Sequence, residues 1–483
     1  MFRRIVTSPL GVLALSVTAL TLWTVAYRAQ AETGTRSPLA EAALLPGRAE
    51  AQSEGAGLGV RPRVPTLPAI PEVRPPPRLR APWADGSPPG LEIAVQDRDG
   101  HSLDALHAAL RRAHAGQGQA RLVFYGASHT ASDLYTGYLR AALQQMFGDA
   151  GHGFVLPVTP WRGYRHQGVE VASAPQDWVA LKIGAAPWTL DHYGFGGVAV
   201  EASTPSARGS VETTTQFPFG QSVGLFDLYY LIQPDGGRFD VLIDGLPVER
   251  VSTAGDLRQP GYATFHVPDG PHRLEVRVVG DGPVRLFGVV MEREVPGIVV
   301  DQLGINGARA RSHLFWDDAL YREHLRRRNP DLVVLAYGTN ESGDDQPIEE
   351  YRDQLRQVVG RIRETVPNAS CLLVGPSDRP LQVGRNEYVE RPRTAQIVET
   401  QWRVALENGC AFFDTVAFQG GPMSTVAWAE MSPPYAGRDM VHFTRRGYER
   451  MGQVILGALL DGTSYRPPAN VVLPGSEPIP PIP

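Results

Sequence analysis

The chain has 483 residues, 42% of them hydrophobic, which is enough for two or three domains with substantial apolar cores. Its formal net charge of −5 gives no reason to expect a nucleic-acid partner. The sequence contains no His-Glu-x-x-His, no cysteine pair at zinc spacing and no EF-hand loop, so we expect neither a metal site nor a cofactor.

Residues 1–31 are typical of an export segment. Arg3 and Arg4 precede a charge-free run from Ile5 to Tyr27, and a small-x-small cleavage site follows at residues 29–31. The run is also about long enough to cross a bilayer, so an uncleaved membrane anchor is the alternative. In both cases we expect the rest of the chain outside the cytoplasm, in the periplasm or cell envelope or secreted.

Residues 32–90 are rich in Pro, Ala, Arg and Gly without sustained apolar periodicity, and the tail at 467–483 is similar. This composition predicts a disordered linker. Such a segment would serve as a tether to the membrane or as a spacer with no further role.

Five apolar runs alternate with helical patterns in the segments 91–157 and 294–466. The strands are predicted at 122–125, 298–301, 331–337, 371–375 and 411–414. Alternation of this kind predicts a parallel α/β sheet with helices on both faces, and it places active residues at the carboxyl ends of the strands.

A serine follows the first of these strands directly. Gly126-Ala127-Ser128-His129 lies between the run 122–125 and a helical pattern, so Ser128 is expected at a strand-to-helix turn. The backbone N–H groups at such a turn can stabilise an oxyanion. This is a suitable place for a nucleophile, although a lone serine there is more often only a helix cap.

A nucleophilic serine needs a base and an orienting carboxylate. Asp439 and His442 supply both at a spacing that lets their side chains reach one side of a turn, and Thr444 is the expected N-cap of the helix that follows. Between the two ends of the chain, Asn340 follows the strand at 331–337, where its amide can donate to developing negative charge.

The segment 158–293 has a different pattern. It contains alternating strands, Gly/Pro-rich turns and an Asp-Gly hairpin turn at residues 244–245, which predict an inserted β-sandwich or jelly roll. Trp161 and Trp188 are aromatic side chains able to stack on sugar rings. The alternative is that they belong to the core or to a domain interface.

Four blocks in this order resemble the SGNH (GDSL-type) hydrolase superfamily: the Ser128 turn, Gly304 to Gly307, Gly338 to Glu341, and Asp439-x-x-His442. The β-rich insertion after the first block resembles the peptidoglycan and polysaccharide O-acetylesterase branch, in which a carbohydrate-binding-like module interrupts the catalytic domain. The resemblance implies a flavodoxin-like three-layer α/β domain with a parallel sheet of about five strands.

The resemblance also implies roles for individual residues. Ser128 is the expected nucleophile, His442 the base and Asp439 its orienting partner. The backbone N–H groups of Ser128 and Gly307 and the side chain of Asn340 form the expected oxyanion hole. The family usually has Asp where this chain has Ala127, and that Asp supports the loop rather than performing chemistry.

Other polar residues near the blocks are expected to support the site. His129 is interpreted as a site-lining or structural residue, because neighbours at a helix start point in different directions. Asp133 and Glu341 are expected to form supporting hydrogen bonds. The turn at 375–379 is expected at the same edge, where it either shapes the pocket or is only a turn.

Cys371 and Cys410 open two of the predicted strands and suit an oxidising compartment. A disulfide and two buried thiols are equally compatible with the sequence.

Three functions remain open. The first is an esterase that removes acetyl or other small acyl groups from peptidoglycan or another extracellular polysaccharide. The second is an acyltransferase that passes the same acyl group to a sugar hydroxyl. The third is a non-catalytic glycan-binding protein, for which the only support is Ala127.

Overall fold

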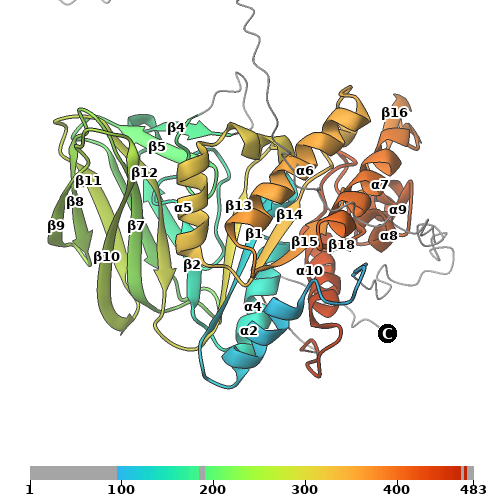
Figure 1. Ribbon diagram of the computed structural model, residues 1–483, viewed down its shortest axis with the longest axis horizontal. Coiled ribbons are helices and arrows are strands. Elements are labelled where there is room, and N and C mark those ends of the chain that lie inside the picture. Colours follow the sequence, from blue (N-terminus) through green and yellow to red (C-terminus); the bar gives the residue numbers. More distant parts are fainter. Residues whose placement is uncertain (1–94, 184–190, 469–470, 472, 476–483) are drawn as a thin grey trace, which may run out of the picture. The chain divides into compact units, whose positions relative to one another are not determined.

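The computed structural model describes residues 95–183, 191–468, 471 and 473–475 (Figure 1). The predicted export segment 1–31, the linker 32–90, Trp188 and most of the tail from 467 to 483 lie outside the described residues. Within the described part, no helix has the length and apolar character needed to span a bilayer.

A five-stranded parallel sheet forms the centre of the hydrolase-like part of the chain. The strands lie in the order β13-β1-β14-β15-β18. Counted along the chain, β13 is the second strand of this sheet and lies outside the first, β1, which is the flavodoxin-like order. This confirms the predicted α/β fold. The strand bounds are β1 Gln119–Gly126, β13 Gly297–Gly304, β14 Leu332–Ala336, β15 Ser370–Val374 and β18 Ala411–Phe413.

Helices cover both faces of this sheet because its strands are apolar on both sides. On β1, Leu122 and Phe124 pack with α2, α4 and α10, whereas Val123 and Tyr125 pack with α5, α6 and α7. The helix bounds are α2 Asp104–His114, α3 Ser128–Ala131, α4 Tyr135–Phe147, α5 Asp318–Arg328, α6 Ile348–Thr365, α7 Pro392–Glu407, α8 Thr415–Gln419, α9 Ser424–Glu430 and α10 Arg445–Leu460.

Two antiparallel sheets form the insertion, with an apolar core between them. One sheet has the order β10-β7-β12-β5-β4, with β2 also paired to β12, and the other has the order β3-β6-β11-β8-β9. Their bounds are β2 Gly151–Val155, β3 Val169–Ser173, β4 Val179–Lys182, β5 Val198–Ala202, β6 Arg208–Thr213, β7 Val223–Ile232, β8 Arg238–Ile243, β9 Leu246–Ser252, β10 Gln259–Gly270, β11 Arg273–Val278 and β12 Val284–Glu292.

The sandwich and the parallel sheet are joined by strands and by buried charges. Strand β2 precedes residue 158 but pairs with β12 of the sandwich. Arg328 on α5 lies 2.6 Å from Asp301 on β13 and 2.5 Å from Glu292 on β12, with all three side chains buried. Because separating buried charges is costly, this network ties the two parts of the fold together.

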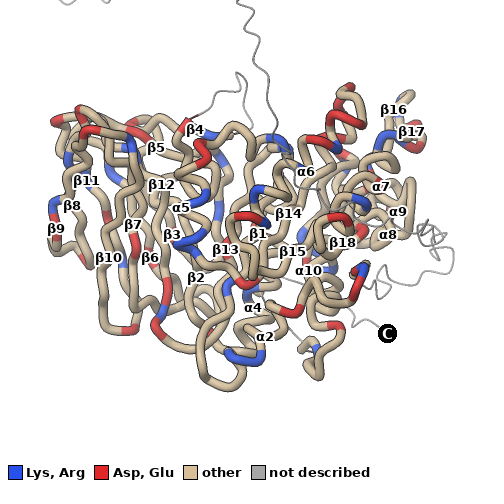
Figure 2. The backbone as a smooth tube through the Cα atoms, viewed as in Figure 1, with Lys and Arg blue, Asp and Glu red and all other residues tan. Residues whose placement is uncertain are grey.

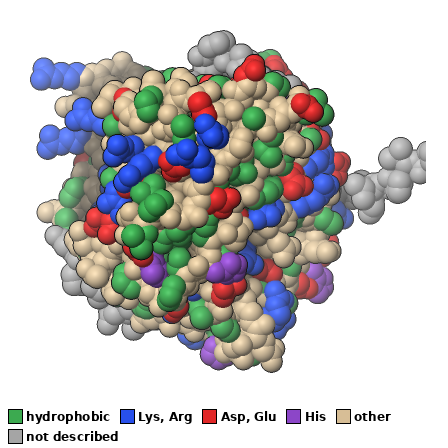
Figure 3. Space-filling view, turned by 90° about the vertical axis from the view of Figure 1, so that its left-hand side faces the viewer, with side chains coloured by type: hydrophobic (Ala, Val, Ile, Leu, Met, Phe, Trp, Pro, Cys, Tyr) green, Lys and Arg blue, Asp and Glu red, His purple; other side chains and the backbone are tan. Residues whose placement is uncertain are grey.

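The outer end of the sandwich exposes apolar side chains at the edge strand β9. Leu246 and Val248 on this strand are exposed, as is Leu257 in the following loop. Figure 3 views this end of the molecule, where apolar side chains lie among basic ones and histidines.

Cys371 and Cys410 form a disulfide at the start of two adjacent strands. Cys371 lies in β15, and Cys410 immediately precedes β18, to which β15 is paired. The bond closes a loop with a sequence separation of 39 residues, so the structure selects the disulfide from the two alternatives that the sequence left open.

Candidate active site

The turn between β1 and α3 places Ser128 at the carboxyl edge of the parallel sheet. The turn is tight because two glycines allow close backbone approach. A Cβ on Gly126 would lie 2.9 Å from the carbonyl oxygen of Ala336, and one on Gly304 would lie 2.1 Å from the backbone nitrogen of Ala131. Helix α3 therefore packs directly against the end of β13, and the end of β1 lies close to that of β14.

Ala127 is the N-cap of α3, is buried, and provides no side-chain hydrogen bond to that helix. The support that an Asp would give here is therefore absent from this position. Neighbouring polar contacts hold the turn instead, because Ser132 donates to the carbonyl oxygen of His129 at 2.7 Å and Thr130 bonds the Tyr135 hydroxyl at 2.8 Å.

A second turn, immediately before α10, carries Asp439 and His442. One oxygen of Asp439 accepts the backbone N–H of Val441 at 3.1 Å and that of His442 at 3.0 Å. Met440 has a positive φ of 55°, which closes the turn. Thr444 caps α10 through its hydroxyl, which accepts the N–H of Gly447 at 3.3 Å, as the sequence predicts.

These two turns bring the predicted nucleophile, base and carboxylate into one chain of hydrogen bonds. His442 Nε2 lies 2.8 Å from Ser128 Oγ, and His442 Nδ1 lies 2.6 Å from the second oxygen of Asp439. The His442 and Asp439 side chains are 43% and 53% exposed, so a large substrate can reach them. This geometry allows His442 to take the Ser128 proton while Asp439 fixes the ring orientation.

The electrostatics of Asp439 favour this arrangement. Partial burial opposes ionisation, but the hydrogen bonds from the His442 ring and from the two backbone N–H groups outweigh it and lower the pKa of Asp439 below its ordinary value. The carboxylate is therefore ionised at neutral pH and can stabilise the imidazolium that forms during proton transfer.

Gly307 and Asn340, the other predicted oxyanion residues, lie on the loops after β13 and β14. Gly307 has a φ of 79°, and the Ala308 N–H bonds back to Ile305 across this turn. Asn340 Nδ2 donates to the carbonyl oxygen of Ala308 at 2.9 Å. An amide nitrogen carries two hydrogens, so Asn340 can still donate to a developing oxyanion.

Glu341 links these two loops. Its carboxylate accepts the N–H of Ala310 at 2.8 Å and that of Gly338 at 2.9 Å. The side chain is buried, which raises the pKa of Glu341 against the lowering effect of those hydrogen bonds. Glu341 therefore holds the loops of Gly307 and Asn340 together. Its carboxylate bonds these backbone groups and not Ser128, His442 or Asp439, in agreement with a supporting role.

Asp133 has a similar supporting role elsewhere. Its buried carboxylate accepts hydrogen bonds from Thr136, from both Nη atoms of Arg140 and from the Gln167 backbone. It thereby anchors the start of α4 to the segment that leads into the sandwich.

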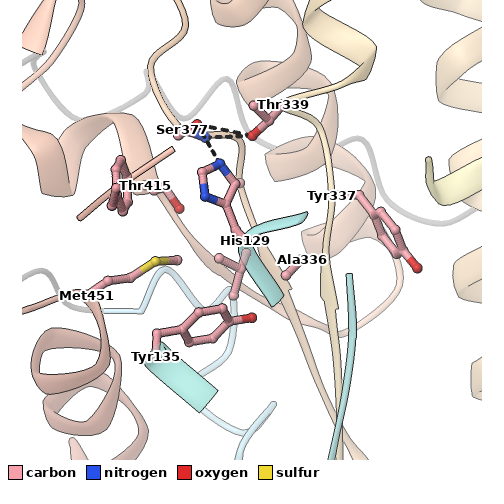
Figure 4. A pocket seen from close by; sticks show the side chains of 11 residues that line it. His129, Tyr135, Ala336, Tyr337, Thr339, Ser377, Thr415 and Met451 are labelled. Atoms are coloured by element: carbon pink, nitrogen blue, oxygen red, sulfur yellow. Dashed lines mark hydrogen bonds between the residues drawn. The ribbon is translucent and has the colours of Figure 1, made fainter. Parts of the chain in front are cut away.

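His129 lies behind the nucleophile, between α10 and the end of β15. Its Nδ1 is 2.8 Å from the Tyr448 hydroxyl, and its Nε2 is 3.1 Å from Ser377 Oγ. Figure 4 shows the ring directed toward Ser377, which in turn contacts Thr339. Burial and the nearby His442 lower the pKa of His129 to about 3, so its ring is neutral near pH 7.

The ring of His129 also lines a small cavity of about 10 Å³ with Tyr135, Thr339 and Thr415. The turn at 375–379 contributes Gly375 and Ser377 to this cavity, so it lies at the same edge as expected. The turn that contains Ser377 was expected at this edge, but the contacts of Ser377 and Tyr448 with His129 were not identified from the sequence, because they depend on how α10 and the end of β15 approach His129.

Trp161 lies in the segment between β2 and β3, where it lines a surface groove of about 340 Å³ with Pro160, Pro175 and Trp178. The Lys182 ammonium lies 5.5 Å from the centre of the Trp161 ring. Trp178 is buried and donates its indole N–H to the carbonyl oxygen of Arg208 at 3.1 Å, so it is a core residue. The predicted sugar contact through Trp161 stays a prediction, and Trp188 lies outside the described residues.

Among the described residues, no group of three or more His, Cys, Asp or Glu side chains is placed to hold a metal ion.

Comparisons with known proteins agree with this geometry. The sequence pattern of the GDSL-like lipase/acylhydrolase family matches residues 275–450. A solved peptidoglycan O-acetylesterase is similar over 76% of this chain and 97% of its own, with a TM-score of 0.63 and 24% sequence identity, which shows a common fold. No curated protein matches this chain in sequence.

Two further solved structures resemble the chain more distantly. The salicylyl-acyltransferase SsfX3 has a TM-score of 0.28 and 16% identity, covering 62% of this chain and 95% of its own. A family two carbohydrate esterase from Clostridium thermocellum has a TM-score of 0.26 and 11% identity, covering 55% and 94%. At these scores neither resemblance carries a functional argument.

Proposed function

We propose that this chain is an esterase of the SGNH (GDSL-type) hydrolase superfamily and that it removes acetyl or other small acyl groups from peptidoglycan or another extracellular polysaccharide. The family pattern over residues 275–450 and the fold shared with a peptidoglycan O-acetylesterase support this proposal. The observation that carries the proposal is the hydrogen-bonded chain from Ser128 through His442 to Asp439 at the carboxyl edge of the sheet.

In the proposed mechanism, Ser128 Oγ attacks the ester carbonyl while His442 Nε2 takes its proton. The oxyanion is stabilised by the N–H groups of Ser128 and Gly307 and by the Asn340 side chain. His442 returns the proton to the departing sugar hydroxyl, which leaves an acyl group on Ser128. Water, deprotonated by His442, then attacks the acyl carbon, and His442 returns that proton to Ser128 Oγ as the bond to the acyl group breaks and the carboxylic acid leaves.

The choice of a polymeric substrate rests on three observations. The exposure of His442 and Asp439 suits an ester on a bulky chain. The inserted sandwich adds a groove lined by Trp161, whose ring can stack on a sugar face. The fold shared with a peptidoglycan O-acetylesterase supports the same substrate class.

The proposed cellular location of the protein rests on the sequence outside the described residues. We propose that the chain is exported through residues 1–31 and that residues 32–90 tether or space the folded part from the membrane. The disulfide between Cys371 and Cys410 supports an oxidising compartment.

The test is acetate release by purified protein and by its Ser128→Ala variant from O-acetylated peptidoglycan, acetylated xylan and an aryl acetate. We expect release from at least one glycan and a loss of several orders of magnitude in the variant. Release from no substrate contradicts the esterase proposal. Transfer of the acetyl group to an added sugar, in preference to water, would show an acyltransferase instead.

A further inference from the structure

Arginines are concentrated beside the oxyanion loops. Arg309 lies on the loop after β13, Arg379 follows the end of β15, and Arg391 is the N-cap residue of α7. The short hairpin of β16, Leu381–Gly384, and β17, Glu387–Val389, separates Arg379 from Arg391 along the chain. Figure 2 shows basic positions where this hairpin and α7 meet.

Arg379 contacts the loop that carries Asn340. Its Nη1 donates to the carbonyl oxygen of Thr339, the residue before Asn340, at 3.1 Å. The same nitrogen lies against Gly343, where a Cβ would approach it to 2.5 Å. Arg391 Nε in turn donates to the backbone carbonyl of Arg379 at 3.0 Å. The Arg379 guanidinium is therefore held beside the loop of Asn340, and Arg391 is held beside Arg379.

Arg309 differs from these two because it is neutralised. It forms a two-pronged ion pair with Asp344, at 2.6 Å and 2.5 Å, and donates to the carbonyl oxygen of Gly307 at 3.1 Å. Its charge is thus used within the protein to join the loops of Gly307 and Asn340.

Arg379 and Arg391 have no such partner. In the described part of the chain, neither guanidinium has a carboxylate within ion-pair distance. Partial burial and the neighbouring Arg391 lower the pKa of Arg379, while Asp344 opposes that shift. Helix α7 adds to the positive potential because its N-terminus points here and its first turn contains no acidic residue. The arrangement leaves positive charge uncompensated beside the active site.

We propose that Arg379 and Arg391 form an anion subsite that binds a carboxylate of the acylated glycan, so that the substrate is an acidic polysaccharide or a glycan carrying an acidic peptide. This inference rests on the esterase function proposed above. A guanidinium binds a carboxylate through parallel charge-assisted hydrogen bonds, which fix position as well as contribute affinity. Arg379 bonds the carbonyl oxygen of Thr339, the residue before Asn340, so the bound carboxylate would belong to the acylated sugar or to its immediate neighbour.

The experiment compares kcat/KM for three substrates: an O-acetylated xylo-oligosaccharide, an O-acetylated oligogalacturonate and an O-acetylated disaccharide-peptide from peptidoglycan. The first is neutral, the second has its carboxylates on the sugar, and the third has them on the peptide. Each substrate is assayed with the wild type, Arg379→Gln, Arg391→Gln and Arg385→Gln. Arg385 lies exposed in the hairpin turn and serves as a control with the same change of net charge.

We expect the wild type to prefer at least one acidic substrate. Arg379→Gln and Arg391→Gln should each reduce the acidic-to-neutral ratio of kcat/KM about tenfold, as loss of a charge-assisted hydrogen bond implies. Arg385→Gln should change the ratio less than twofold. The acidic substrate whose rate falls identifies the source of the carboxylate.

Gly343→Ala provides a second approach, since its methyl group displaces the Arg379 guanidinium without removing the charge. This variant should also lower the ratio. The proposed subsite would be contradicted if Arg379→Gln and Arg391→Gln lowered kcat/KM equally on neutral and acidic substrates. Hydrolysis of the neutral substrate alone by the wild type would contradict it as well. Absence of hydrolysis on all three substrates would contradict the esterase proposal itself.

Discussion

The parallel sheet and the antiparallel sandwich place their polar side chains differently. In the sheet, Ser128 opens the helix after β1, and Gly307 and Asn340 lie on the loops after β13 and β14, so one edge collects all three. In the sandwich, the strands alternate buried and less buried residues along their length, as on β11. A parallel sheet thus concentrates reactive groups in one place, whereas a sandwich distributes its contacts over a surface.

This difference predicts that substitutions in the Ser128-His442-Asp439 chain and at Asn340 affect turnover of every ester, whereas substitution of Trp161 affects polymeric substrates alone.

Among the substitutions considered below, Asp439→Asn is expected to lower kcat the most. The variant keeps the shape of the turn but removes the charge that stabilises protonated His442, so kcat on an aryl acetate should fall on the order of 10³-fold. Asp256→Asn, an exposed change in the sandwich, is the matched control and should leave kcat unaltered. A loss below tenfold for Asp439→Asn would mean that the carboxylate does not act on the base.

Asn340→Ala is expected to lower kcat by roughly 10²–10³ with a smaller change in KM, because its amide is used mainly in the transition state. Steady-state kinetics on the aryl acetate measure both constants. If KM alone increases, Asn340 binds the ground-state substrate and is not part of the oxyanion hole.

Glu341→Ala tests the link between the two oxyanion loops. Removing the carboxylate leaves the buried N–H groups of Ala310 and Gly338 without an acceptor, which should reduce the free energy of unfolding by about 2–4 kcal/mol. We also expect kcat to fall about tenfold at a temperature where the variant is folded. Denaturant unfolding and kinetics report the two effects separately, and unchanged values of both would contradict the positioning role.

Trp161→Ala tests whether the inserted sandwich contributes to binding of a polymeric substrate. Loss of one stacking contact of about 1 kcal/mol should reduce kcat/KM on polymer about fivefold while sparing the aryl acetate. Trp178→Ala is the structural control, since Trp178 is buried and its loss should reduce stability and hence both activities. Equal reductions by Trp161→Ala on both substrates would assign Trp161 to the fold rather than to sugar binding.

The smallest effect on activity is expected from replacing both cysteines by serine. Because Cys371 and Cys410 lie away from the carboxyl edge of the sheet, kcat should stay within twofold of the wild type. The free energy of unfolding should fall by about 2–4 kcal/mol, as loss of a disulfide in a folded domain implies. Denaturant unfolding checks this, and an unchanged free energy would mean that the cross-link does not constrain the unfolded chain.

The sequence predicted the parallel sheet and the positions of Ser128, Asp439 and His442 because each lies in a short contiguous block, Ser128 directly after a strand and the other two directly before a helix. The pairing of β2 with β12 was not predicted, since it joins residues far apart along the chain and has no periodic pattern. For the same reason, the ion pair between Arg309 and Asp344 was missed: it joins two loops whose approach only the fold determines.

The role of His129 shows where sequence reasoning stops. Its position beside the nucleophile was evident, but its contacts with Tyr448 and Ser377 depend on how α10 and the end of β15 approach the turn. The choice between disulfide and free thiols also required the strand pairing, because only the register of β15 with β18 brings Cys371 and Cys410 together.

The most direct test of the proposed mechanism is to trap the acyl-enzyme. The protein would be mixed with an aryl acetate, quenched in acid within the first turnover and digested for mass spectrometry. We predict one added acetyl group on the peptide that contains Ser128, and none on that peptide in the Ser128→Ala variant. Acetate release by the variant at the wild-type rate, or an acetyl group on a different residue, would contradict Ser128 as the nucleophile.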